Sequence, residues 1–186
     1  MAGFKYVGSE TGGEINGKLK RFALTTSHGG ILGPGDLVLT TAASNDAGEP
    51  TVDVGTANSA NTGVICFVDI ESLIATENLS QTWVSAYTAG YVMVNVDAFA
   101  LYVADVSNGP LAAADVGLNV PAVVTAGTVT GSLFTSNMGV NATGKATTAT
   151  LPFRVVALLE DDDGVLGNRA LVRVNASTSN IGATGI

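Results

Sequence analysis

Few side chains in this sequence are suited to catalysis. The chain contains a single histidine, His28, and a single cysteine, Cys66. One ligand of each kind cannot build the tetrahedral nitrogen and sulfur sites that zinc prefers. No Gly-x-Ser-x-Gly turn is present, and no glycine motif matches a phosphate-binding loop. We therefore predict no catalytic residue, no cofactor and no metal, with His28 in a loop and Cys66 as a small buried apolar side chain in a strand.

The only dense group of carboxylates is the run Glu160–Asp163. Calcium needs oxygen ligands that converge from several directions. Consecutive residues in a turn between strands point in alternating directions, so we favour a solvated turn or a charged contact with a partner over a calcium site. Sugar hydrolysis by paired carboxylates would also need acids that face each other across a cleft. The aromatic residues Trp83, Tyr87 and Tyr91 favour a small core cluster, with an interface patch as the alternative.

The charges are few and unevenly distributed. Only 13% of the residues are charged and the net charge is −8, which is typical of a surface that other proteins cover rather than of a free monomer. Residues 22–144 contain ten acidic and no basic side chains. Such a body repels phosphate, so nucleic-acid binding is excluded.

The first 21 residues have the opposite character, with four basic and two acidic side chains. We predict that this segment docks on an acidic partner, on a neighbouring copy or on its own body, and a solvated tail is the alternative. The predicted partner-binding residues are Ile15, Asn16, Lys18, Lys20 and Arg21.

No part of the sequence predicts insertion into a membrane. The opening residues lack the apolar segment of a secretion signal. The most apolar long stretch, residues 89–106, contains Asn95, Asp97 and Asp105, so it is not a membrane span. We expect synthesis in a cytoplasm, where the protein either stays soluble or is assembled.

The elements that must position these residues are short strands separated by glycine-rich turns. We predict a short strand at 22–26, which ends the N-terminal arm, and further strands at 36–41, 51–54, 64–70, 90–96, 99–106, 122–133, 151–159 and 170–174. We expect 90–96 and 99–106 to form a hairpin-like pair, and 64–70 to be buried on both faces. The prediction is an all-β fold, a barrel or sandwich with an extended N-terminal arm and a second set of β-strands packed on it. Its parts are an arm (1–35), a barrel-like domain (36–107), a second β subdomain (108–176) and a tail (177–186).

The order of several short motifs resembles the head decoration proteins of marine tailed bacteriophages. The motifs in the first half are Glu14-Ile15-Asn16-Gly17, Gly35-Asp36-Leu37-Val38, Gly48-Glu49-Pro50-Thr51-Val52, Gly63-Val64-Ile65 and Tyr91-Val92-Met93-Val94. Those in the second half are Val116-Gly117-Leu118-Asn119, residues 148–155 (TATLPFRV) and Val172-Arg173-Val174-Asn175. The likeness runs over nearly the whole chain. The chain departs from the family in the segment 71–88 and in its tail.

The resemblance implies a capsid cement protein without catalytic residues. Such a protein binds the outer surface of the head, bridges neighbouring major capsid proteins and also contacts other copies of itself as a dimer or trimer. The alternative is another phage structural β-protein, either a tail or fibre protein or a minor capsid component.

Overall fold

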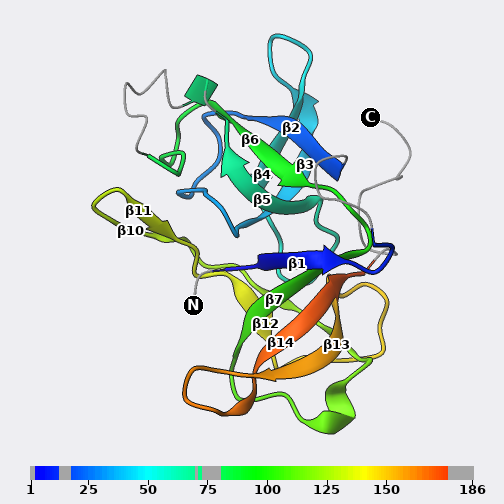
Figure 1. Ribbon diagram of the computed structural model, residues 1–186. Helices are drawn as coiled ribbons and strands as arrows, with labels where there is room; N and C mark the ends of the chain where they lie inside the picture. The colour runs from blue at the N-terminus through cyan, green and yellow to red at the C-terminus, as the bar shows by residue number, and fades with distance from the viewer. Residues whose placement is uncertain (1–2, 13–17, 70, 73–80, 176–186) are drawn as a thin grey trace.

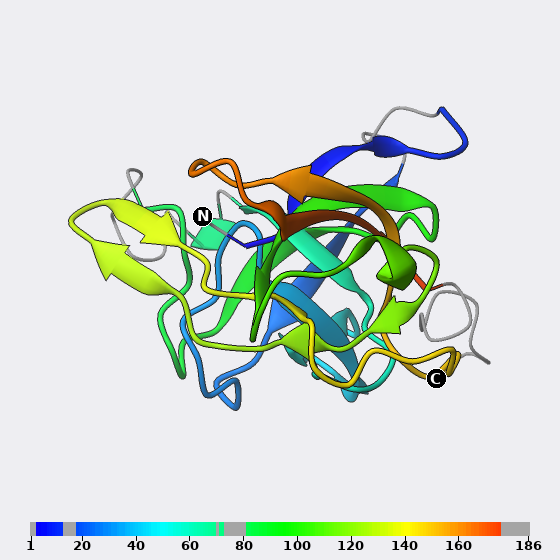
Figure 2. The same cartoon turned by 90° about the horizontal axis from the view of Figure 1, so that it is seen from below.

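The computed structural model describes residues 3–12, 18–69, 71–72 and 81–175, and these ranges fold almost entirely as β-structure. Figures 1 and 2 show two β-bodies packed against each other, a barrel and a more open sheet. The predicted all-β fold, with a barrel and a second set of strands packed on it, is confirmed.

The barrel closes in the order β2-β4-β3-β5-β6, and β2 pairs in parallel with β4 and antiparallel with β6. Its strands are β2 (Leu19–Leu24), β3 (Leu37–Ser44), β4 (Pro50–Val54), β5 (Gly63–Val68) and β6 (Gly90–Asn95). Alternate side chains point inward, as the period of two in a strand requires. On β6, Val92 and Val94 are fully buried, whereas Tyr91 and Met93 are only half-buried.

The second body is a seven-stranded sheet in the order β8-β13-β14-β7-β12-β9, with β1 also paired to β7. Its strands are β1 (Lys5–Ser9), β7 (Ala100–Ser107), β8 (Asn119–Val120), β9 (Ala122–Val123), β12 (Gly139–Asn141), β13 (Phe153–Glu160) and β14 (Leu166–Val174). Strands β1 and β14 flank β7, and both run antiparallel to it. A separate hairpin of β10 (Thr128–Thr130) and β11 (Leu133–Thr135) extends from this body, and Ala113–Asp115 form a 3₁₀ turn.

The two bodies share a boundary at the start of β3 and β5. Leu37 and Val64 belong to the core of the sheet, whereas their neighbours Val38 and Ile65 belong to the core of the barrel. The prediction that this part of β5 is buried on both faces is confirmed, although Phe67 further along the strand is 47% exposed. Gly63 lies so close to β6 that an added Cβ would stand 2.1 Å from the Asn95 carbonyl oxygen. A side chain at this position would therefore separate two barrel strands.

The segment predicted as an N-terminal arm is built into both bodies where the structure describes it. Strand β1 pairs with β7, and the Phe4 ring stacks on Phe153 with 4.5 Å between the ring centroids. Strand β2 closes the barrel, and its Phe22 and Leu24 are in the barrel core. The partner of β1 lies more than about 90 residues further along the chain, and the two partners of β2, β4 and β6, lie about 28 and about 70 residues further along. No local sequence pattern could have revealed them.

The predicted hairpin between residues 90–96 and 99–106 is wrong. Strand β6 pairs with β2 and β5 in the barrel, whereas β7 pairs with β1, β12 and β14 in the sheet. The link between them is held by side chains: Asn95 Oδ1 accepts from the Asp97 amide, and Asp97 Oδ1 accepts from the Phe99 amide, each at 3.0 Å. The boundary between the bodies therefore lies near residue 97 rather than 107. The predicted tail 177–186 is outside the described residues.

Among the described residues, no helix is long and apolar enough to span a membrane.

Candidate interaction surfaces

The predicted partner-binding residues are largely engaged within the chain. Ile15 and Asn16 lie outside the described residues. Lys18 Nζ forms a 2.7 Å ion pair with the buried carboxylate of Asp97. Burial, the largest single effect, would raise the pKa of Asp97, but the hydrogen bonds from Lys18, Ser9 and the Phe99 amide and the charge of Lys18 together outweigh it and hold that pKa below its ordinary value. Lys18 thus ties β2 to the link between the two bodies and is not a free docking cation.

Arg21 is surrounded by acids of its own chain. Its guanidinium pairs with Glu49 at 3.3 Å, with Asp69 at 3.4 Å and with Glu71. The same group stacks on the Tyr91 ring, 3.8 Å from its centroid. Of the predicted cations only Lys20 is exposed without an ion pair to a described residue, and its Nζ lies 5.2 Å from the centre of the Phe22 ring.

The same pattern holds for the other basic residues. Lys145 pairs with Asp115, Arg169 with Asp105 and Asp162, and Arg173 with Glu10. Within the described ranges, the basic residues without an ion pair are Lys5, Lys20 and Arg154. The internal pairing leaves little positive charge for a partner.

The acidic run 160–163 leads from the end of β13 into a turn in which the carboxylate of Asp161 faces the turn's own backbone. Asp161 Oδ1 accepts from the amides of Asp163 at 3.1 Å and Val165 at 2.8 Å, and its Oδ2 accepts from Asn168 at 2.7 Å. The Asn168 bond, followed by the Val165 amide, lowers the pKa of Asp161. No three His, Cys, Asp or Glu side chains in the described part of the chain converge on a cation position.

His28 and Cys66 have surroundings that do not suit catalysis. His28 is fully buried, with Nδ1 2.9 Å from the Gly30 carbonyl and Nε2 2.7 Å from the Thr88 carbonyl. Both ring nitrogens therefore face main-chain acceptors, and His28 joins two loops. Cys66 lies on β5 as predicted, but it is half-buried at a groove rather than in the core. Burial raises the pKa of its thiol, which favours the weakly nucleophilic protonated form.

The predicted aromatic core cluster is wrong. Tyr87 is 67% exposed, and Tyr91 lies on the outer side of the barrel under Arg21. The aromatic residues that meet in the core are instead Phe4, Tyr102 and Phe153. Sequence reasoning missed them because they come from three segments that are distant in the chain: Phe4 directly precedes β1, Tyr102 is on β7 and Phe153 is on β13.

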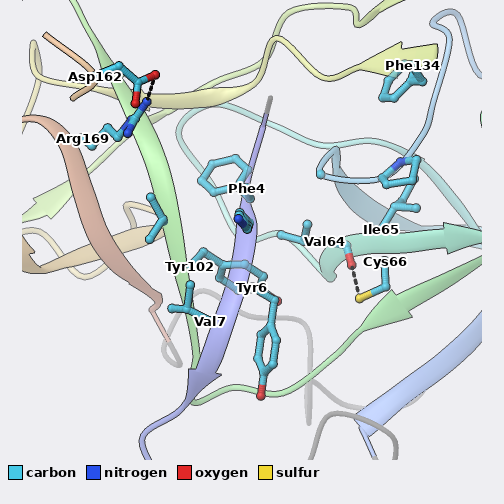
Figure 3. A pocket seen from close by; sticks show the side chains of 14 residues that line it. Phe4, Tyr6, Val7, Val64, Ile65, Cys66, Tyr102, Phe134, Asp162 and Arg169 are labelled. Carbon is cyan, nitrogen blue, oxygen red and sulfur yellow. Dashed lines mark hydrogen bonds and ion pairs between the residues drawn. The ribbon is translucent and has the colours of Figure 1, made fainter. Parts of the chain in front are cut away.

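A groove of about 820 Å³ runs between β1 and β5. Figure 3 shows Tyr6 of β1 and Cys66 of β5 on its two sides. The lining is mainly apolar and includes Val7, which is 50% exposed. Strand β1 has no neighbour on this side among the described strands, so its backbone contributes an unpaired edge.

The β10–β11 hairpin projects from the body, as both ribbon views show (Figures 1 and 2). Its base is fixed by Phe134, whose ring fills the space where Gly33 and Gly127 have no side chain. A Cβ would approach this ring to 2.5 Å at Gly33 and to 2.3 Å at Gly127. Towards the tip, Leu133 is 65% exposed. The hairpin is thus anchored at its base and presents an apolar side chain to the outside.

The third open edge belongs to β13. Its first residues are covered, since Gly117 N–H donates to the Val155 carbonyl and Val155 N–H donates to the Leu118 carbonyl, both at 2.9 Å. From Val156 to Glu160, no described segment pairs with the outer side of the strand. Residues 156–159 are all apolar and half-exposed. The sequence signal for this edge was the run Val155–Leu159, but the run alone does not say which side lacks a partner.

Comparison with known proteins identifies no relative: no family model, no curated protein and no solved structure matches this chain.

Proposed function

We propose that this chain is a structural virion protein without catalytic activity, a capsid cement protein that binds the outside of a phage head and bridges neighbouring major capsid proteins. The observation that carries this proposal is the surface of the chain: its strands leave open apolar edges, and its cations are mostly engaged in internal ion pairs. Adhesion through main-chain hydrogen bonds and apolar contacts suits such a surface. The ordered motifs shared with head decoration proteins support the same role.

The β10–β11 hairpin is the element best suited to reach a capsid subunit. Its strands have free outer edges among the described elements, so an extended segment of a neighbour can add to it by β-augmentation. Leu133 would enter an apolar pocket of that neighbour, because it is exposed and close to the tip. One such contact is weak, but many copies on a closed shell turn weak contacts into firm attachment. The strengthened shell would then resist the outward pressure of the packed genome.

The test measures binding of the purified chain to phage heads that lack it, by co-sedimentation. Binding to isolated capsid subunits is measured for comparison. We expect binding to assembled shells only. Leu133→Lys should lower occupancy at least about tenfold, because it places a charge in an apolar contact. Leu166→Lys is the matched control, since Leu166 is also exposed, at 56%, but lies on β14 away from the hairpin.

Two results would contradict the proposal. The first is equal binding of wild type and Leu133→Lys to shells and to isolated subunits, which would indicate non-specific adhesion. The second is an elongated trimer that binds no shell, which would favour a tail or fibre component.

A further inference from the structure

We infer that a hollow beside Arg154 and Arg173 is a binding site for a single carboxylate, supplied by a glutamate side chain of a partner protein. The hollow has a volume of about 260 Å³ and lies on the outer face of the sheet, where β13 and β14 meet the segment 116–117. The inference goes beyond the capsid role, because it assigns a ligand chemistry to one site of the free chain.

Two arginines stand directly opposite each other at this hollow. Arg154 of β13 is in register with Arg173 of β14, and the residues before and after each of them are buried, so both arginines point to the outer face. Side chains directly opposite on neighbouring strands have Cβ atoms roughly 5 Å apart, and like charges in this position are unfavourable. An anion placed between the two guanidinium groups would relieve that repulsion.

The chain itself supplies one anion to this pair of cations. Arg173 Nη1 donates to Glu10 Oε2, whereas Arg154 is exposed and forms no ion pair with a described residue. The Nε atom of Arg173 is buried and has no hydrogen-bond partner among the described residues. Two cations and one anion therefore leave a surplus positive charge, together with N–H donors that lack an acceptor.

The other acids of this region are held away from the hollow. Asp115, which precedes the lining residue Val116, accepts from Lys145 at 2.6 Å. The acidic run 160–163 begins six residues along β13 from Arg154, roughly 20 Å away, which is beyond the screening length of about 8 Å at physiological salt. The hollow thus attracts an anion even though the net charge of the chain is −8.

The walls of the hollow favour a carboxylate on an aliphatic stem. Guanidinium groups bind planar carboxylates through parallel N–H donors. Val116, which is 45% exposed, and Val156 add apolar surface beside these donors. Gly117 leaves space over Arg154, because even an added Cβ would stand 3.8 Å from Arg154 Nη2. A glutamate side chain, with two methylene groups and a carboxylate, matches both parts of this lining.

An NMR titration of the purified chain tests the inference. The probe is the peptide acetyl-Ala-Glu-Ala-amide at about pH 6, where its only charge is the ionised glutamate, and the control peptide carries glutamine instead. The chain has four arginines, so their Nε–H signals can be followed individually. We expect saturable shifts at Arg154 and Arg173 with a dissociation constant of about 1–10 mM, and none with the glutamine peptide at equal salt. The ion-paired Arg21 and Arg169 are internal controls.

Substitutions identify the residues that hold the probe. Arg154→Gln should weaken binding of the glutamate peptide at least about tenfold, and the fold should survive because one of two opposed like charges is removed. Arg154→Lys keeps the charge without the planar fork, so it should restore only part of the binding. Lys20→Gln is the matched control, because Lys20 is also without an ion pair to a described residue but stands opposite Val94 rather than a second cation. It should leave binding unchanged.

Four results would overturn the inference. They are equal shifts at all four arginines, which would indicate screening alone, absence of saturation below about 100 mM peptide, unchanged binding by Arg154→Gln, and tighter binding of inorganic phosphate than of the glutamate peptide, which would indicate a phosphate site. The titration of the wild-type chain keeps the test decisive if a variant does not fold. Because no phage head is present, none of these results bears on the capsid proposal.

Discussion

Replacing Asp36 should change how the stability of this protein depends on pH. Asp36 lies at the boundary between the two bodies and is fully buried. Its Oδ2 accepts from the Gly33 amide at 3.0 Å, but its Oδ1 has no hydrogen-bond partner. Burial raises the pKa of Asp36 from 3.8 to about 7, and the nearby Ser136 side chain and the Gly33 amide offset only part of that effect. The charged form is therefore disfavoured in the folded state.

The sign and size of the effect follow from this shift. Because this pKa is raised in the folded state, the destabilisation by Asp36 is absent well below pH 3.8, where its carboxyl is neutral in both folded and unfolded chains, and it grows as the pH rises to about 7. Taking 3.8 for the unfolded chain, linkage gives a cost of about 1 kcal/mol at pH 4.5 and about 4 kcal/mol at pH 8. Asp36→Asn has no such charge, and its amide oxygen can still accept from Gly33. The stability of Asp36→Asn relative to wild type should therefore rise by about 3 kcal/mol between these two pH values.

Urea denaturation at pH 4.5, 6 and 8, followed by circular dichroism, measures this difference. The stability difference between Asp36→Asn and wild type is compared at two pH values, so the pH-independent cost of fitting an amide into the site cancels. The other carboxylates contribute equally to the pH dependence of both proteins. Asp46→Asn, in the exposed turn between β3 and β4, is the control for losing one negative charge. Equal pH dependence in wild type and Asp36→Asn would refute the reasoning, because it would mean that Asp36 is charged at no cost in the folded protein.

Further predictions concern the core, one turn, metals and salt. Phe4→Ala should lower the free energy of unfolding by about 3–5 kcal/mol, because Phe4 is 3% exposed and its ring stacks on Phe153 in the sheet core. The control, Val7→Ala, should lower it by less than about 1 kcal/mol, because Val7 is 50% exposed. Similar urea midpoints for the two variants would contradict this. Gly167→Ala should be far more destabilising than Gly164→Ala: both have positive φ, but only at Gly167 would the Cβ meet a carbonyl, that of Leu111 at 2.1 Å. Chelators and added calcium should leave the melting temperature unchanged, and a calcium-dependent rise of several degrees would instead indicate a cation site in the acidic turn. Bound protein on phage heads should persist to about 1 M salt, where the screening length falls to about 3 Å, and complete release by moderate salt would show that the contacts are mainly ionic.

The sequence allowed prediction of the strands whose signal is local. The strands β3, β4, β5 and β6 were expected to within about three residues, because apolar alternation and turn residues mark them. The prediction of strand pairing failed where the paired strands are far apart in the sequence. The short segment 97–98 between two strong predicted strands suggested a hairpin, but the chain crosses here from one body to the other. Only the three-dimensional positions of β2 and β14 distinguish the two arrangements.

The candidate surfaces were harder to predict, because they depend on what remains unpaired after folding. Lys18 and Arg21 were selected for their charge, and the fold places acids from distant segments around both. Conversely, the exposure of Leu133 depends on where its neighbour Phe134 packs. The open edge of β13 begins after Val155, the last residue whose backbone is hydrogen-bonded to the segment 117–118. Neither is encoded in the residues of the surface itself.

The flanking of β7 by β1 and β14 has a mechanical consequence. Both strands run antiparallel to β7, so the described chain enters at the start of β1 and leaves at the end of β14, at opposite ends of this three-stranded unit. Tension applied to these two ends would pull the strands past one another lengthwise and would load their hydrogen bonds side by side, all at once. The barrel is inserted between β1 and β7 and would carry none of this load. A protein held at both ends on an expanding surface would therefore resist stretching through its central strands while its barrel stayed relaxed.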